Sequence, residues 1–280
     1  MNRRSDGKKL AVDGGPKAVS KAIPPRGLLD EKEKNAVAAL FDQAIAAGQA
    51  IGYNGEQEEE YCREFAEALG GGYADAVNSG TNAIYVALRA LELPAFSEVI
   101  VPPISDPGGV MPVPLCNLIP IIADAQPGSF NAGPDEIAAR ITRRTSAVIV
   151  AHIAGEPADM ASIMKLARKH KLAVIEDCAQ SHGAVYRGKP CGTIGTAGAF
   201  STMHGKHHCT GGQGGVVYTR SKKLYWKIRQ CADRGKPFGL PSGTRNVVAS
   251  LNMNLNEISA CIGRVQIGTF SAASSRARPR

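Results

Sequence analysis

Two side chains in one stretch of the sequence could carry out covalent chemistry together. Asp177 closes an apolar run at residues 172–177, and Lys206 follows in a polar, glycine-rich segment. A carboxylate at the carboxyl end of a buried strand faces the crevice where α/β sheets bind ligands, and it needs a metal, a hydroxyl or a protonated ring nitrogen there. A lysine amine forms a Schiff base with a carbonyl compound when it is partly unprotonated. A loop-capping aspartate and a solvated lysine are the structural alternatives that this pattern leaves open.

A third element, the sequence NSGTNA at residues 78–83, connects a short apolar run to a helical pattern. The residues Ser79, Gly80 and Thr81 would expose backbone N–H groups and small hydroxyls at the positive end of a helix, which favours a phosphate. Serine and threonine are also the ordinary N-cap residues of helices. The turn alone therefore does not distinguish a phosphate site from a helix cap.

Together, the phosphate turn, the strand-end carboxylate and the later lysine indicate pyridoxal 5'-phosphate. That cofactor needs an anchored phosphate, a Schiff-base lysine and a carboxylate that keeps its ring nitrogen protonated. The carboxylate matters because only a protonated ring withdraws electrons strongly from the substrate carbon. A nicotinamide dinucleotide is disfavoured, because the chain has no G-x-G-x-x-G between a strand and a helix.

A metal centre is the rival interpretation of the segment around Lys206. It contains four potential ligands within six residues, namely His204, His207, His208 and Cys209. The two adjacent histidines would point in different directions on a strand or helix, and the spacing matches no usual zinc site. We therefore expect no metal here.

The composition is that of a soluble globular protein, with 44% hydrophobic and 21% charged residues among 280. No apolar run approaches the roughly 18–20 residues of a membrane span, and no apolar segment follows the basic start as in a secretion signal. Seven scattered cysteines without a CxxC pair indicate reduced thiols and a cytoplasmic location. Most of the net charge of +8 lies near the two ends, and aromatic residues are only 5%, so nucleic-acid binding is disfavoured.

The elements that must position these residues alternate between helix and strand. Asp30 and Glu33 form a capping-box-like start for a helix that stops at Gly48. The apolar residues of this helix fall on one face, namely Val37, Leu40, Phe41, Ala44 and Ile45. Apolar periodicity predicts further helices at 56–69, 81–93, 134–141, 159–170 and 221–231, and strands at 74–78, 98–102, 118–124, 146–154, 172–177, 198–202 and 214–219. Short β-branched strands separated by helices predict a mainly parallel α/β sheet covered on both faces.

Seven motifs in this order resemble the DegT/StrS-type sugar aminotransferases, which are pyridoxal-phosphate enzymes of fold type I. They are NSGT at 78–81, VIVPP at 99–103, HIAGEPADM at 152–160, VIEDCAQSHGA at 174–184, FSTMHGK at 200–206, GGQGG at 211–215 and LNMNLNEISACIG at 251–263. The resemblance implies an N-terminal arm and helix at 1–54, a cofactor-binding large domain with a seven-stranded sheet at 55–265, and a disordered or truncated tail at 266–280.

The resemblance also assigns roles around the cofactor ring. Lys206 matches the Schiff-base lysine, and Asp177 matches the partner of the pyridine nitrogen. Ala179 matches the small residue packed under the ring, and Gln180 matches the group near the phenolic oxygen.

Further matches concern the cofactor phosphate. Gly80 and Thr81, beside Ser79, match the phosphate cradle, and Ser201 matches a further phosphate contact. Asn252 matches an asparagine that reaches the phosphate bound by the partner subunit, which implies a homodimer with shared sites.

The implied reaction is transamination. An amino acid, commonly glutamate or glutamine, gives its amino group to the cofactor, which passes it to a keto group of a nucleotide-linked sugar or cyclitol in antibiotic or polysaccharide biosynthesis. Lys206 would move the proton as general base and acid. Relatives with histidine at this position dehydrate their substrate instead, so the lysine favours amino transfer. The alternative is a non-catalytic homologue that binds the cofactor or a partner subunit without turnover.

Two departures from the family pattern accompany these matches. An aromatic residue that stacks on the cofactor ring often follows the PP motif, whereas this chain has Asp106 within PPISDPGGV. Family members also usually continue into a smaller domain that closes over the substrate, while this sequence stops after SAASSRARPR. We expect a nearly complete cofactor site with an incomplete substrate pocket and lid.

Overall fold

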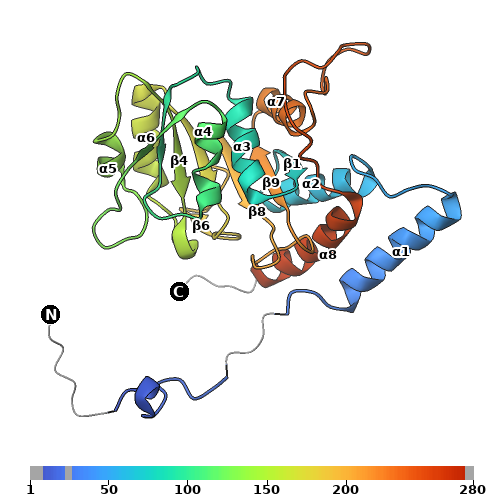
Figure 1. The fold of residues 1–280 in the computed structure, drawn as a ribbon, viewed down its shortest axis with the longest axis horizontal. Coiled ribbons are helices and arrows are strands. Elements are labelled where there is room, and N and C mark those ends of the chain that lie inside the picture. Colours follow the sequence, from blue (N-terminus) through green and yellow to red (C-terminus); the bar gives the residue numbers. More distant parts are fainter. Residues whose placement is uncertain (1–8, 23–26, 275–280) are drawn as a thin grey trace.

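The chain folds around one seven-stranded sheet with helices on both faces (Figure 1). The computed structural model describes residues 9–22 and 27–274. The strand order is β1-β9-β8-β5-β4-β2-β3, and a separate two-stranded sheet is formed by β6 and β7. The strands are β1 (Tyr73–Val77), β2 (Glu98–Val101), β3 (Ile119–Ile122), β4 (Thr145–Ala151), β5 (Ala173–Asp177), β6 (Val185–Tyr186), β7 (Lys189–Pro190), β8 (Ala197–Ser201) and β9 (Gly215–Thr219).

Strand direction brings the predicted site elements to one edge of this sheet. The strands β3, β2, β4, β5 and β8 pair in parallel, and only β9 runs antiparallel to its neighbours β8 and β1. The ends of β1, β2, β5 and β8 and the start of β9 therefore lie along the same edge. The predicted mainly parallel α/β architecture is confirmed.

The helices follow the predicted alternation, with small shifts at their ends. They are α1 (Glu31–Ala47), α2 (Glu56–Ala68), α3 (Gly80–Ala90), α4 (Pro112–Leu115), α5 (Pro134–Ala138), α6 (Met160–His170), α7 (Lys222–Ala232) and α8 (Glu257–Ser274), with 3-10 turns η1 (Ala11–Asp13), η2 (Pro107–Gly109) and η3 (Ile153–Gly155). The capping box predicted for α1 is present, and Gly48 ends the helix at φ 64°. Successive residues of each strand point to opposite faces of the sheet, so the apolar side chains form one layer on each face. Ile175 belongs to the apolar cluster that includes residues of α3 and α7, whereas Val174 belongs to the cluster that includes residues of α5 and α6.

The C-terminal helix was not predicted from the sequence. α8 runs to Ser274, so residues 266–274 of the expected disordered tail are helical, while residues 275–280 lie outside the described part. Ala260 and Ile267 are buried on α8, which packs along α2 and α1. Once this packing holds the helix, its later turns continue without an apolar pattern of their own.

The first residue of α8 also completes α2. The N-cap of α2 is Gly55, which has no side chain for capping. Glu257 supplies the missing acceptor, because its carboxylate accepts hydrogen bonds from the backbone N–H groups of Gly55, Gln57 and Glu58 at 3.2, 3.0 and 3.0 Å. A carboxylate at a helix N-terminus is favourable both as a hydrogen-bond acceptor and as a charge.

The apolar face predicted for α1 is not buried within the chain. Phe41 is 46% and Ile45 is 74% exposed, whereas Glu33 near the start of the helix is buried. Gln266 of α8 donates a hydrogen bond to Glu33 Oε1 at 2.6 Å, which ties down the beginning of α1. The remainder of α1 extends past the body (Figure 1). Within residues 9–22 and 27–274, no helix has the length and apolar character needed to cross a membrane.

Candidate active site

A cavity of about 240 Å³ opens at the edge where the parallel strands end. It is lined by residues from the start of α3, the turn after β2, the end of β5 and the loop before β9. Its lining residues are Ser79, Gly80, Thr81, Ile84, Asp106, Gly108, Gly109, Asp177, Ala179, Ser201, Met203, Lys206 and Gln213. Seven of the nine predicted site residues therefore meet in one place.

The first wall is the start of α3. Ser79 is the N-cap, and its side chain accepts a hydrogen bond from the Asn82 N–H at 3.1 Å. A Cβ added to Gly80 would lie 2.5 Å from the Cβ of Ser201, so only glycine allows the turn to approach β8 this closely. The first N–H groups of an α-helix have no partner within the helix, which makes this wall suitable for an anion.

Asp177 ends β5 and is half-buried at the floor of the cavity. Its Oδ1 accepts a hydrogen bond from the Ala179 N–H at 3.0 Å. Burial raises the pKa of the Asp177 carboxyl, while the Ala179 hydrogen bond and the positive charge of Lys206 oppose that rise. A cation that replaced lost solvent would stabilise the ionised form, and a protonated ring nitrogen is such a cation.

Lys206 lies in the loop between β8 and β9, with its backbone N–H bonded to the Met203 carbonyl at 2.8 Å. The side chain is half-buried and lines the same cavity as Asp177. Its Nζ forms no ion pair with any residue that the structure describes. The amine is therefore held near the carboxylate without being neutralised by it, which leaves it available to a carbonyl group.

A buried network behind the cavity was not predicted from the sequence. Glu176, next to Asp177, accepts hydrogen bonds from the N–H groups of Gly192, Ile194 and Gly195 at 2.9, 2.7 and 2.6 Å. It also lies 3.1 Å from Nε2 of His152. The only sequence signal was the pair of acids that closes the apolar run, and its partners are distant in the chain.

This network resembles a metal site in composition but not in its hydrogen bonding. Ligand atoms of His152, Glu176 and Cys178 lie within 4.8 Å of one another. However, Nδ1 of His152 accepts a hydrogen bond from the Ala158 N–H at 3.1 Å, so Nε2 carries the proton that faces Glu176. Both histidine nitrogens and both carboxylate oxygens are thus already used, and the cluster fixes the ends of β4 and β5.

Two predicted site residues lie outside the cavity lining. Gln180 is not among the residues that line the cavity, and its Oε1 accepts a hydrogen bond from the Ala154 N–H at 2.9 Å. Asn252 is exposed and accepts hydrogen bonds from Asn254, including one of 2.7 Å from its side-chain amide. Neither side chain contributes to the cavity of its own chain.

The histidines near Lys206 do not converge. His208 is buried with its Nε2 at 2.7 Å from the hydroxyl of Tyr61, and Cys209 is buried beside Gln266. His204 and His207 are exposed. The four candidate ligands of the rival interpretation therefore point to different places.

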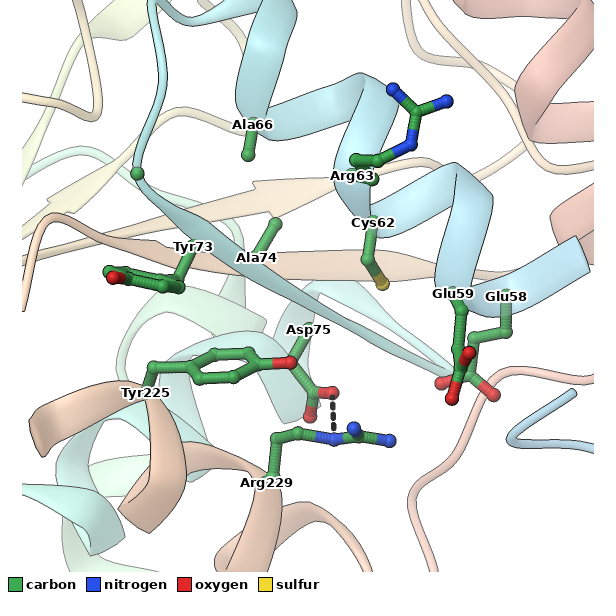
Figure 2. Close-up of a pocket in the computed structure, with 11 residues that line it drawn as sticks. Glu58, Glu59, Cys62, Arg63, Ala66, Tyr73, Ala74, Asp75, Tyr225 and Arg229 are labelled. Carbon is green, nitrogen blue, oxygen red and sulfur yellow. Dashed lines mark ion pairs between the residues drawn. The ribbon is translucent and has the colours of Figure 1, made fainter. Parts of the chain in front are cut away.

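A second cavity, of about 340 Å³, lies at the free edge of β1 between α2 and α7. Figure 2 shows Arg229 of α7 directed at Asp75 of β1, and its Nε lies 3.3 Å from Asp75 Oδ1. Tyr73 and Tyr225 stack beside this pair with ring centroids 5.2 Å apart. No lysine is among the described residues that line this groove, and its buried Asp75 already has a cationic partner.

The fold defines the class of this protein. A mainly parallel sheet with helices on both faces is the large-domain fold of fold type I pyridoxal-phosphate aminotransferases. The sequence profile of the DegT/DnrJ/EryC1/StrS aminotransferase family matches residues 30–279, and the chain belongs to that family.

Several known proteins are similar to this chain. It is 36% identical to an L-glutamine:2-deoxy-scyllo-inosose aminotransferase of Streptomyces lividus over 81% of this chain and 54% of that protein. It is 34% identical to a GDP-perosamine synthase of Caulobacter vibrioides over 74% of this chain and 55% of that protein. An aminotransferase structure from Psychrobacter cryohalolentis superposes with a TM-score of 0.80 at 35% identity, covering 88% of this chain and 63% of that one. The chain spans about half the length of the curated relatives it matches.

Proposed function

We propose that this chain carries the cofactor site of a pyridoxal-phosphate-dependent aminotransferase that acts on a sugar or cyclitol. Aminotransferases of this family are pyridoxal-phosphate-dependent. The observation that carries the proposal is that Lys206, Asp177 and the start of α3 line a single cavity. An amine without an ion pair, a half-buried carboxylate and a helix N-terminus whose Gly80 packs against Ser201 are the groups this cofactor requires.

Each residue of the cavity has a separate task in this proposal. When bound, pyridoxal phosphate supplies a carbonyl conjugated to an electron-withdrawing ring. The N–H groups at Gly80 and Thr81, with the hydroxyl of Ser201, would hold the phosphate. Asp177 would keep the ring nitrogen protonated. Lys206 would anchor the carbonyl carbon and, once an incoming amine has displaced it, move the proton on the substrate carbon as base and then acid.

For the substrates, we propose an amino-acid donor, glutamate or glutamine, and a keto group on a cyclitol or nucleotide-linked sugar as acceptor. The names of the two relatives above support both acceptor classes.

A second candidate function is cofactor binding without turnover. The observation that favours it is the carboxylate of Asp106, which stands where a stacking aromatic residue is expected.

We also propose a cytoplasmic homodimer with shared sites. The exposed apolar side chains Phe41 and Ile45 of α1 would gain burial against a second copy. Asn252 is exposed and outside the cavity of its own chain, which is compatible with a contact to the phosphate in a partner. All seven cysteines are free thiols, which supports a reducing compartment.

Covalent trapping tests the central proposal. Purified protein is mixed with pyridoxal 5'-phosphate, reduced with borohydride and digested for peptide mapping. We expect the label on Lys206 and its loss in Lys206→Ala. Adding glutamate or glutamine before reduction should remove the label if the first half-reaction proceeds. Label that persists with every donor favours the non-catalytic candidate, and the absence of any label contradicts cofactor binding.

A further inference from the structure

The turn Ser105–Gly109 (SDPGG), which follows β2, forms one side of the candidate cavity. Three of its residues, Asp106, Gly108 and Gly109, are part of the lining. None of the described lining residues is aromatic. The family resemblance places an aromatic ring close to Asp106, and in this chain the turn itself stands at that position.

The backbone of this turn packs directly against both halves of the predicted cofactor site. A methyl group added at Gly108 would overlap Oγ1 of Thr81, in the phosphate cradle. A methyl group at Gly109 would overlap Oγ of Ser105 and lie 3.0 Å from Oδ2 of Asp177. Neither glycine has a positive φ. Glycine is therefore required here for space and not for backbone conformation.

The turn is also internally fixed. Asp106 accepts a hydrogen bond on Oδ1 from the Gly108 N–H at 2.9 Å, and its carbonyl accepts one from the Gly109 N–H at 2.9 Å. Pro107 restricts φ in the same turn, and its carbonyl accepts hydrogen bonds from Val110 and Met111 at 3.0 and 2.8 Å. A wall held by so many local bonds keeps its shape before any ligand arrives, which favours binding.

The turn adds charge as well as shape. Asp106 is an exposed carboxylate that lines the cavity together with Lys206. Its negative charge contributes to raising the pKa of Asp177, after the larger effect of burial, so the two carboxylates interact across the cavity. The cavity thus holds two carboxylates and one lysine among its charged lining residues.

We propose that the turn Ser105–Gly109 is the wall that contacts the cofactor ring in this chain. In this arrangement the glycine backbone at 108 and 109 takes the place of an aromatic side chain, and Asp106 is a second anionic group that favours the protonated form of the Lys206 Schiff base. The proposal rests on the proposed function and names which residues replace the expected stacking contact.

Substitution of the two glycines tests the wall. We titrate pyridoxal 5'-phosphate into wild type, Gly108→Ala, Gly109→Ala and the control Gly268→Ala, and follow the absorbance of the bound cofactor. The control adds its methyl on α8 where nothing lies within 4 Å. We expect affinity to fall at least about ten-fold in the two turn variants, because the methyl displaces Thr81 or Asp177, and to stay unchanged in the control. Turn variants that bind as tightly as wild type would overturn the proposal.

Substitution of Asp106 tests the charge without disturbing the fold of the turn. Asparagine also caps well, so Asp106→Asn keeps the acceptor for Gly108 and removes only the charge. The pH midpoint of the absorbance change of the bound cofactor should fall by roughly 0.5–1 unit in Asp106→Asn and return towards wild type in Asp106→Glu. An unchanged midpoint would overturn this part of the proposal.

The outcomes separate this inference from the proposed function. If wild type binds no pyridoxal phosphate, both the proposed function and the proposed role of the turn Ser105–Gly109 are wrong. If wild type is labelled on Lys206 but none of the turn variants differs from it, the function stands and only the wall is wrong. Circular dichroism and thermal melting of each variant identify any loss of affinity that comes from unfolding.

Discussion

Two cavities of this chain differ in how their basic side chains are paired. In the edge groove, Arg229 of α7 is paired with Asp75 of β1, and a stacked tyrosine pair covers them (Figure 2). In the strand-end cavity, Lys206 and Asp177 share the space, yet Nζ of Lys206 forms no ion pair with a described residue. The groove is the larger of the two, about 340 against 240 Å³. Volume therefore does not identify the site, whereas unpaired and convergent functional groups do.

The difference follows from what each cavity must do for folding. The groove joins three elements, α2, β1 and α7, and Arg229 of α7 compensates the charge of Asp75 on β1. Removing one partner would leave the other uncompensated in a place with little water. In the strand-end cavity, Lys206 and Asp177 form no ion pair, and a cofactor that bound both groups would stabilise the folded chain. Four substitutions test this contrast.

Lys206→Ala should have the largest effect on chemistry and almost none on stability. We expect complete loss of borohydride labelling and of any amino transfer, because no other amine lines the cavity among the described residues. The free energy of unfolding should change by no more than about 0.5 kcal/mol, because Nζ has no ion pair to lose. Peptide mapping and urea unfolding measure the two effects, with the exposed Lys223→Ala as control. Labelling that persists in Lys206→Ala would show that another amine binds the cofactor, and the contrast between the two cavities would be wrong.

Arg229→Met should show the reverse pattern. The guanidinium pairs with Asp75 and lies 4.4 Å above the ring of Phe238, so its loss should cost about 3–5 kcal/mol of stability. Labelling of Lys206 should persist at temperatures where the variant is folded. Arg220→Met, at an exposed arginine, is the matched control. The double variant Arg229→Met/Asp75→Asn should recover part of the loss, and a double variant as unstable as the sum of the single ones would argue against coupling.

Asp177→Asn should separate cofactor binding from cofactor activation. The amide cannot stabilise a protonated ring nitrogen, so we expect labelling of Lys206 to remain while the half-reaction with the amino donor slows by about 10²–10³-fold. Single-turnover absorbance measurements test this, with the exposed Asp42→Asn as control. An undiminished rate would show that the carboxylate is only a loop cap.

Glu58→Gln should change how stability depends on pH, which is the smallest of the four effects. Burial, and then repulsion from Asp75, raises the pKa of Glu58 from 4.5 to about 8. A carboxyl that holds its proton more tightly when folded contributes stability that is complete below pH 4.5 and is lost as the pH rises towards 8. The neutral glutamine should therefore be more stable than wild type by about 1–3 kcal/mol at pH 8, with little difference at pH 5.

Urea unfolding across this pH range checks the prediction for the groove. The exposed neighbour variant Glu59→Gln should leave the pH dependence unaltered. A Glu58→Gln variant whose stability falls with pH as steeply as wild type would place the titrating group elsewhere, with Asp75 as the next candidate because burial raises its pKa to about 6.

Local patterns in the sequence predicted the fold and the ends of most elements. The capping box at Asp30, the glycine stop at Gly48 and the acid at the end of β5 are all short-range signals, and all three lie where they were predicted. The strand-end rule then placed Asp177 and the start of α3 at one edge, because parallel strands end on the same side of the sheet.

The features that escaped prediction depend on contacts between distant segments. The packing of Gly108 against Thr81 and of Gly109 against Asp177 exists only once β2 lies in the sheet. The direction of Gln180 was set by the backbone of Ala154, and no spacing rule describes that contact. The exposed apolar face of α1 was predicted as a face, but the periodicity could not say what would cover it.

The cap that α8 places on α2 joins two segments that are synthesised at different times. The carboxylate that stops the first turn of α2 from fraying belongs to a residue about 200 positions later, Glu257. During synthesis on the ribosome, α2 emerges long before its cap exists. We expect its N-terminal turn to become fully capped only after Glu257 has left the exit tunnel and α8 has packed on α2.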